Sequence, residues 1–190
     1  MKSARSFLLF PILLMVVACS AADDSFDKSI KTFDKKPPNY PDALILLPNA
    51  SEIRYYELAG TYQLTYRVSV EYPAKPAIAA ISEELKRLNW APLGEDYLNP
   101  GLSSSHVRGW TSFEDATKKP RQTVHQWLAD WENQTGEVVT YGFRYQYESG
   151  KTEDLRHLTV IAIFIPAPLA KQTREQALEF TKKHNAEKAK

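Results

Sequence analysis

Histidines that could act as a general base or bind a metal ion are scarce in this sequence. Histidine, the residue best suited to both roles, occurs only four times. The four positions are His106, His125, His157 and His184. No two of them are four residues apart, and a single cysteine leaves no C-x-x-C pair, so the spacing does not support a zinc site. The sequence therefore predicts no metal and no other cofactor.

Nucleophilic catalysis is also poorly supported. Ser103–Ser105 directly precedes His106, but neighbours in sequence rarely adopt the geometry of a nucleophile and its base. The chain contains no G-x-S-x-G motif, and its seven glycines are scattered rather than gathered into a phosphate-binding loop. We predict no catalytic residue. The alternative is a hydrolase in which a histidine meets an aspartate or glutamate from a distant part of the chain.

The one cysteine, Cys19, follows a segment with the pattern of a secretory signal. Two basic residues precede the apolar run Phe7–Val17, which is interrupted only by Pro11. This run of about 11 residues fits the core of a signal peptide and is shorter than the roughly 20 residues that span a bilayer. We therefore predict that residues 1–18 are a signal peptide and are removed during export.

The residues before the cysteine make this prediction more specific. Val16–Val17–Ala18–Cys19 resembles the lipobox of bacterial lipoproteins, with Val17 in place of the commoner small residue. The resemblance implies that the Cys19 thiol receives a diacylglyceryl group and that cleavage before Cys19 exposes an amine, which is then acylated with a fatty acid such as palmitate. Several acyl chains anchor a protein stably, whereas one binds only marginally. The alternative is an ordinary signal peptide and a free thiol, which is unusual in an oxidising compartment.

The resemblance also implies a location and a set of partners. Ser20 follows the cysteine, and in Gram-negative lipoproteins this resembles the class sorted to the outer membrane, facing the periplasm. Removing the signal peptide takes away two of the 24 basic residues and no acidic one, so the formal net charge changes from +1 to −1. This balance predicts no nucleic-acid partner. The expected partners are the membrane, through the lipid anchor, and an envelope protein or a small ligand.

Residues 19–42 are predicted to be a flexible tether. Acidic and basic residues are interleaved there, and the Pro37–Pro38 pair favours extended backbone. The chain that follows suits one domain, predicted over residues 43–168, and without a second cysteine its hydrophobic core must supply the stability. Residues 169–190 are predicted to be a C-terminal helix and tail.

The domain is predicted to be α+β. Its clearest strand is Gln63–Tyr72, where apolar and polar residues alternate over ten positions and give one buried face. Val138–Tyr147 alternates in the same way, and Leu158–Ile165 is apolar on both faces, as expected of a central strand. With shorter candidates, these predict five or six mostly antiparallel strands. The shorter candidates are residues 52–58, 109–114 and 123–133, of which the last also fits a helix.

One main helix is predicted to pack against this sheet. Four apolar residues recur at helical spacing between residues 77 and 89, and Pro76 suits a first helical turn. A polar C-terminal helix is predicted from Lys171 to about Ala186, with Leu178 and Phe180 as its small apolar contact. The expected architecture is a single α+β domain in which the sheet curls over the helix at 77–89.

Aromatic residues form the candidate ligand site. Their rings could line a groove for a sugar, a peptide or a lipid. They could equally be core and cross-strand pairs, which the rhythm of the strands favours. The candidate residues are Trp110, Trp127, Trp131, Tyr141 and Tyr145, with Tyr147 in the same aromatic group.

Three functions follow from these patterns. The first is a lipid-anchored envelope protein that binds a ligand or partner without catalysis, and this is our prediction. The second is the hydrolase, which requires His106, His125 or His157 beside a carboxylate in a cleft. The third is a structural role in envelope assembly. The domain also resembles uncharacterised envelope lipoproteins, a resemblance that implies no function. Solvent exposure of Trp127 and Trp131 is the discriminating observation.

Overall fold

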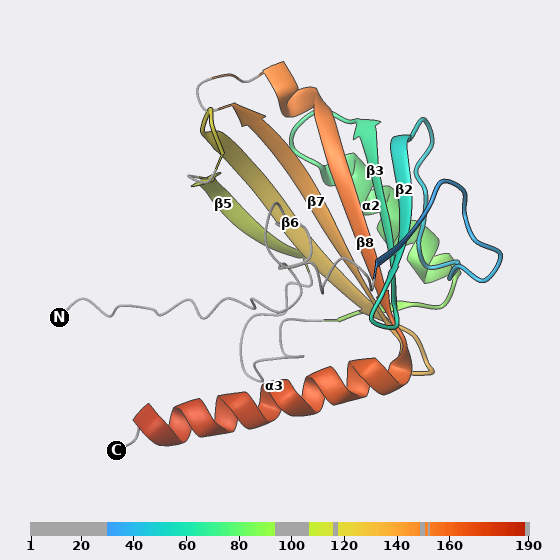
Figure 1. The fold of residues 1–190 in the computed structure, drawn as a ribbon, viewed down its shortest axis with the longest axis vertical. Helices are drawn as coiled ribbons and strands as arrows, with labels where there is room; N and C mark the ends of the chain where they lie inside the picture. The colour runs from blue at the N-terminus through green and yellow to red at the C-terminus, as the bar shows by residue number, and fades with distance from the viewer. Residues whose placement is uncertain (1–29, 94–106, 116–117, 149–150, 152, 189–190) are drawn as a thin grey trace.

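The computed structural model of the chain describes residues 30–93, 107–115, 118–148, 151 and 153–188. Within this part, one antiparallel sheet carries a helix against one face, and a second helix leaves from one end of the sheet (Figure 1). The α+β class predicted from the sequence is confirmed.

The sheet has eight strands, more than the five or six predicted. Its order is β1-β2-β3-β8-β7-β6, and both β4 and β5 pair with the outer edge of β6. The two added strands are β1, which lies in the predicted tether, and β4, which has only two residues and leaves no sequence pattern. The strands are β1 (Ile30–Phe33), β2 (Ser51–Leu58), β3 (Thr61–Ser69), β4 (Ala91–Pro92), β5 (Val107–Asp115), β6 (Gln122–Glu132), β7 (Val138–Glu148) and β8 (His157–Ile165).

Alternation along the strands decides which face is buried. Leu64, Tyr66 and Val68 of β3 are buried, and the first two lie opposite Ala162 and Val160 of β8. β8 lies between β3 and β7 and is buried along most of its length, which confirms it as a central strand. We call the face that carries these residues the inner face and the opposite one the outer face.

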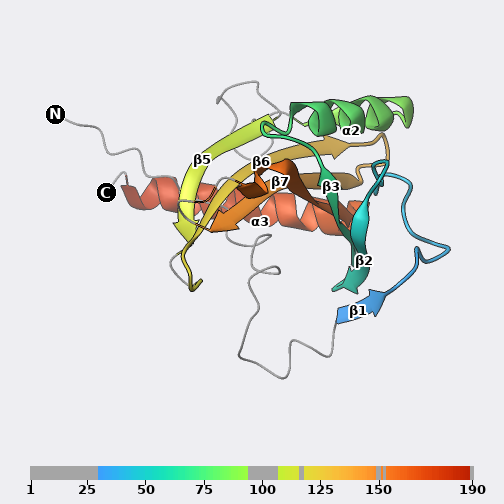
Figure 2. The ribbon, with the colours of Figure 1, turned by 90° about the horizontal axis from the view of Figure 1, so that it is seen from above.

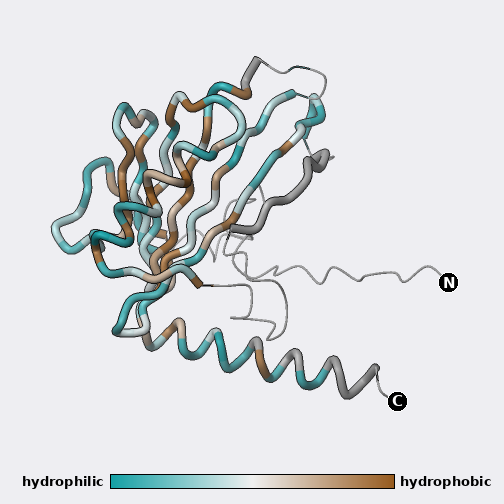
Figure 3. The backbone as a smooth tube through the Cα atoms, turned by 180° about the vertical axis from the view of Figure 1, so that it is seen from behind, coloured by the Kyte–Doolittle hydropathy of each residue, from teal (hydrophilic) through white to brown (hydrophobic). Residues whose placement is uncertain are grey.

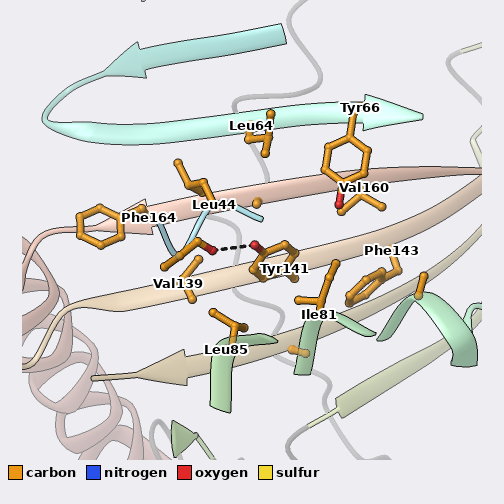
Figure 4. Close-up of a cluster of buried hydrophobic side chains, with 14 of the residues drawn as sticks. Leu44, Leu64, Tyr66, Ile81, Leu85, Val139, Tyr141, Phe143, Val160 and Phe164 are labelled. Carbon is orange, nitrogen blue, oxygen red and sulfur yellow. Dashed lines mark hydrogen bonds between the residues drawn. The ribbon is translucent and has the colours of Figure 1, made fainter. Parts of the chain in front are cut away.

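The helix α2 (Lys75–Arg87) covers the inner face, as predicted, but begins and ends two residues earlier than expected (Figure 2). Ala77, Ile81 and Leu85 are its buried residues, and Figure 4 shows the last two pointing toward β7. The helix ends where Asn89 adopts a left-handed conformation, with φ at 61°. Asparagine tolerates this conformation, which commonly terminates helices.

A segment between β1 and β2, residues 40–47, crosses the inner face and is called the strap here. The Tyr141 hydroxyl donates to the carbonyl of Ala43 at 2.6 Å and accepts the N–H of Ile45 at 2.7 Å (Figure 4). The Tyr66 hydroxyl donates to the carbonyl of Ile45 at 3.1 Å. Two buried phenols of the sheet thus satisfy the backbone of a segment that has no strand partner of its own.

The predicted tether therefore reached too far along the chain. β1 pairs with β2, Phe33 packs against the core, and Tyr40 is buried with its hydroxyl within hydrogen-bond distance of two backbone carbonyls. Residues 30–42 belong to the fold, so the domain includes at least these residues before the predicted boundary at residue 43. An exposed edge strand among charged residues lacks the alternating apolar pattern that reveals other strands.

The second helix, α3 (Ala167–Lys188), is attached mainly through its first turns. Ala170 is buried beside Val138 and Ile163 on the outer face, and Arg174 forms an ion pair with Glu132. Beyond these contacts the helix runs away from the sheet, and its described surface is largely hydrophilic (Figures 1 and 3). None of the described helices has the length and apolar character needed to cross a membrane.

The apolar contact expected from the middle of this helix is not where the sequence placed it. Leu178 is 42% exposed, and the side chain of Phe180 lies outside the described part of the structure. The packing comes instead from Leu169 and Ala170, one turn after the end of β8. The C-terminal helix itself is confirmed, over residues 167–188.

Candidate functional site

Four aromatic side chains meet where β6 begins and β7 ends, at the upper end of the sheet in Figure 1. We call Tyr72, His125, Trp127 and Tyr147 the aromatic surface. The ring centroid of Tyr72 lies 5.1 Å from that of His125 and 5.7 Å from that of Trp127. Tyr72 is 46% exposed, and the other three rings are partly exposed. The result is a contiguous aromatic patch that is open to solvent.

Tyr72 reaches this position because β3 ends at Ser69. The regular alternation stops with the strand, so the Tyr72 ring lies at the end of the inner face, where it packs against Tyr145 but stays half exposed. Its N–H donates to the carbonyl of Leu155 at 3.0 Å, and the Tyr145 hydroxyl donates to the carbonyl of Val70 at 2.8 Å. These two bonds hold the segment over the inner face.

Trp127 is left partly open by its neighbours across the sheet. It lies opposite Phe143 on β7 and opposite Gly109 on β5. Glycine has no side chain, so the paired position of β5 adds no cover to the indole. On its other side the ring packs edge-on against Tyr145, with centroids 6.0 Å apart and an interplanar angle of 87°.

The polar atoms of the aromatic surface are only partly used. His125 Nε2 lies 2.9 Å from the Tyr147 hydroxyl. Among the described residues, Trp127 Nε1 and the Tyr72 hydroxyl have no hydrogen-bond partner, and none of the four side chains forms an ion pair. The surface can therefore combine ring contacts with hydrogen bonds to an uncharged ligand or protein.

The residues predicted from the sequence fall into three groups. Trp131, Tyr141 and Tyr145 have 0% exposure, so they belong to the core and present no surface to a ligand. Trp127 is partly exposed and stays a candidate. The side chain of Trp110 lies outside the described part, although the backbone register pairs it with Gln126 rather than with Trp127. The predicted lipidation site, Cys19, also lies outside the described residues.

Sequence reasoning missed Tyr72 and His125 as members of an exposed site. The alternating pattern of β3, extended to Tyr72, predicted a buried ring. The signal that could have corrected this is Pro73, because a proline has no N–H for a strand ladder and the residue before it often ends the strand. An aromatic residue at such an end can pack on the edge of the buried face and stay partly open to solvent.

The hydrolase hypothesis finds no support at the two histidines that can be assessed. His125 has Tyr147 as its partner, and neither it nor His157 forms an ion pair with a described carboxylate. His106 lies outside the described residues. In the described part of the chain, no group of three or more histidine, cysteine, aspartate or glutamate side chains is placed to hold a metal ion.

No protein-family model matches the chain, and no curated protein is significantly similar to it. Function is therefore inferred from two features of the chain itself. These are the predicted signal peptide at residues 1–18, with Cys19 directly after it, and the geometry of the described surfaces.

Proposed function

We propose that this protein is a lipid-anchored protein of the bacterial cell envelope that acts by binding a ligand or a protein partner rather than by catalysis. The observation that carries the proposal is the motif Val16–Val17–Ala18–Cys19, which places the single cysteine directly after a signal-peptide core. In a Gram-negative cell, Ser20 favours attachment to the inner leaflet of the outer membrane, with the domain in the periplasm.

The anchor would hold the domain close to the bilayer. Ten residues separate Cys19 from Ile30, the first residue of β1. A fully extended chain covers at most about 3.5 Å per residue, so Ile30 lies within roughly 40 Å of the anchored cysteine. The segment from Ile30 to residue 42, part of the predicted tether, therefore does not add to this distance.

The orientation of β1 supports a binding surface that faces away from the membrane. Ile30 lies opposite Leu58, at the lower end of the sheet in Figure 1, where β2 ends. The aromatic surface lies at the opposite end, beyond the start of β6. The pairing places Trp127 at the level of Tyr66, five residues of β3 from Thr61, which lies opposite Leu58, so about 17 Å along the strands separates the two levels. A partner in the periplasm could reach this surface without displacing the anchor.

The aromatic surface is the described feature best suited to binding. Exposed tyrosine and tryptophan rings supply a large contact area with little loss of conformational freedom, and they are enriched at protein interfaces. We therefore expect the ligand or partner to contact Tyr72 and Trp127 directly.

The anchoring part of the proposal is tested with Cys19→Ala. Wild-type protein is expected in the membrane fraction, with a mass that includes the acyl groups and lacks residues 1–18. The variant is expected to lack the acyl mass, since an alanine has no thiol to modify. An exported wild-type chain with an unmodified thiol would refute the anchoring proposal and leave the binding proposal standing.

The binding part is tested by crosslinking in intact cells followed by capture of the protein. Trp127→Ala and Tyr72→Ala are expected to lose most of the crosslinked partner. Leu46→Ala is the matched control, because Leu46 is an apolar side chain with a similar exposed fraction, 41%, in the strap. Equal capture by all three variants would exclude the aromatic surface as the contact.

A further inference from the structure

A shallow depression of about 340 Å³ lies on the outer face, at the same end of the sheet as the aromatic surface. We call it the Arg67 depression. It is distinct from the aromatic surface because Arg67 and Ser69 alternate along β3 with the inner-face residues Tyr66 and Val68. Six polar residues line the depression: Asn49, Ser51, Glu52, Arg67, Ser69 and His157.

Three adjacent strands bring these side chains together in two rows. Ser51 of β2 lies opposite Arg67 of β3, and Ser69 lies opposite His157 of β8. Residues directly opposite each other share a face, and so do residues two apart on one strand. A guanidinium, an imidazole and two hydroxyl groups therefore gather on one small area of the outer face.

The charged side chains that line the depression balance each other. Glu52 is the one carboxylate among its lining residues, and Arg67 neutralises it through an ion pair of 3.0 Å between Nη1 and Oε1. A guanidinium has five N–H donors, so this pair leaves others for a ligand. Arg54 and Arg144 also lie on the outer face, and Arg144 is two strands from Arg67, at about 10 Å.

Two residues that line the depression adopt left-handed backbone conformations. Asn49 and Glu52 have φ values of 60° and 51°, in the left-handed region that costs a side chain free energy. The register of β2 also shifts between Ser51 and Arg54. Bulges and left-handed residues occur preferentially at functional sites, where they direct side chains toward a ligand.

We propose that the Arg67 depression binds a phosphate group. A tetrahedral oxyanion accepts several hydrogen bonds at once, here from the guanidinium of Arg67, the imidazole of His157 and the hydroxyl of Ser69. The Ser51 hydroxyl lies beside them and donates to the carbonyl of Arg67 at 3.4 Å. The proposal does not depend on the lipid anchor, and it gives the domain a ligand chemically unlike that of the aromatic surface. The phosphate is either free, as the ion or a small ester, or part of a phospholipid headgroup.

The test uses the whole chain, isotopically labelled, and follows backbone amide shifts by NMR. Inorganic phosphate is the first probe, and a short-chain phosphatidylglycerol, kept below its micelle concentration, is the second. Saturable shifts at Ser51, Ser69 and His157 are expected. Shifts with phosphate alone assign a free ion or small ester, and shifts with the lipid alone assign a headgroup. Either result supports a phosphate site, and no saturable shift at these residues with either probe overturns it.

Substitutions distinguish a specific phosphate site from nonspecific electrostatic attraction. Arg67→Gln is expected to weaken binding by about tenfold or more, because a hydrogen bond to a charged group is lost. Arg87→Gln is the matched control: Arg87 is also an exposed arginine paired with a glutamate, Glu84, at 2.9 Å, but it lies on α2. Equal weakening by both variants would overturn the proposal.

A third variant keeps the proposal testable if the Arg67→Gln protein fails to fold. Glu52→Gln removes the only carboxylate that lines the depression, so it is expected to tighten phosphate binding several-fold. A gain in affinity cannot arise from loss of the fold. Unchanged or weaker binding by Glu52→Gln, in a protein with the wild-type spectrum, would contradict the assigned charge balance and with it the proposal.

Discussion

Two tryptophans of one strand show how a residue's role depends on its neighbour across the sheet. Trp127 and Trp131 lie four residues apart on β6 and both belong to the inner face. Trp131 lies opposite Pro92 of β4 and meets Tyr141 edge-on, with ring centroids 5.6 Å apart. Trp127 lies opposite Gly109 and keeps part of its indole in solvent. The alternating pattern places both on one face, but only pairing decides which of them a ligand can reach.

At the same scale, the Tyr141 hydroxyl has an effect on stability that can be measured. Tyr141→Phe removes both the donor to Ala43 and the acceptor for Ile45, and it leaves two strap backbone groups without their partner. Unsatisfied buried polar groups cost about 1–3 kcal/mol, so we expect the free energy of unfolding in urea to fall by about that amount. Tyr56→Phe is the control, since the Tyr56 hydroxyl bonds to no described residue, and we expect a change within about 0.5 kcal/mol. Equal losses would mean that the strap is not held by this hydroxyl.

The two helices contribute to the fold in different ways. α2 places Ala77, Ile81 and Leu85 in the core, whereas the contacts of α3 with the sheet among the described side chains come from its first turns. An amphipathic stripe holds a helix along its length, and a helix without one is held only where it is attached. We infer that the domain is stabilised by α2 and that most of α3 is dispensable for folding.

Truncation of α3 tests this division at the level of elements. A chain that ends after Arg174 keeps Ala170 and the ion pair with Glu132, and we expect its free energy of unfolding to stay within about 0.5 kcal/mol of the full chain. Ala170→Asp, in contrast, places an unpaired charge at a position that is 3% exposed and should destabilise the domain strongly. The measurement is calorimetric unfolding of the truncated chain and of the Ala170→Asp variant, each compared with the full chain. A large loss on truncation would show that the outer part of α3 also stabilises the domain.

The elements that the sequence predicted well are those whose pattern is set by burial on one face. Alternation identified β3 and β7, and helical spacing identified α2. Residues 123–133 fitted either pattern, and the structure shows that they form the strand β6. β1 was missed because an edge strand with charged neighbours buries little, and β4 because two residues hold no period. The aromatic surface was only partly predicted, since Trp127 was named while Tyr72 was assigned to a buried face. Pairing between distant strands, which sequence periodicity does not encode, decides such cases.

Considered as a whole, the molecule has its proposed binding surfaces at one end and its point of attachment at the other. The aromatic surface and the Arg67 depression lie on opposite faces of the sheet, both where β3 ends and β8 begins. The chain enters β1 beside the last residue of β2, at the opposite end. An anchor at Cys19 would therefore leave both faces of the far end accessible to periplasmic ligands, which is the arrangement that a tethered binding protein requires.

The buried phenols also predict how the stability of the whole domain depends on pH. Burial raises the pKa of Tyr66 and Tyr141 above the ordinary value of 10.0, and it raises the pKa of Tyr40 and Tyr145 to about 12. The folded state therefore keeps its protons at a pH where the unfolded chain has begun to lose them. The stabilisation is fully present below the unfolded pKa of about 10 and is lost as the pH rises toward the folded values.

We expect the free energy of unfolding to fall steeply between about pH 10 and pH 12, with each fully buried phenol contributing up to about 1.4 kcal/mol per pH unit. The measurement is urea denaturation over that range, in wild type and in Tyr66→Phe. The variant is expected to start less stable and yet to lose stability less steeply, because phenylalanine has no proton to release. The informative quantity is the slope of the free energy of unfolding against pH. Lysines and the other tyrosines contribute equally to this slope in both proteins, so a difference between the slopes comes from Tyr66. An identical slope would mean that the Tyr66 hydroxyl reaches solvent, and that the strap does not seal the inner face as the structure describes.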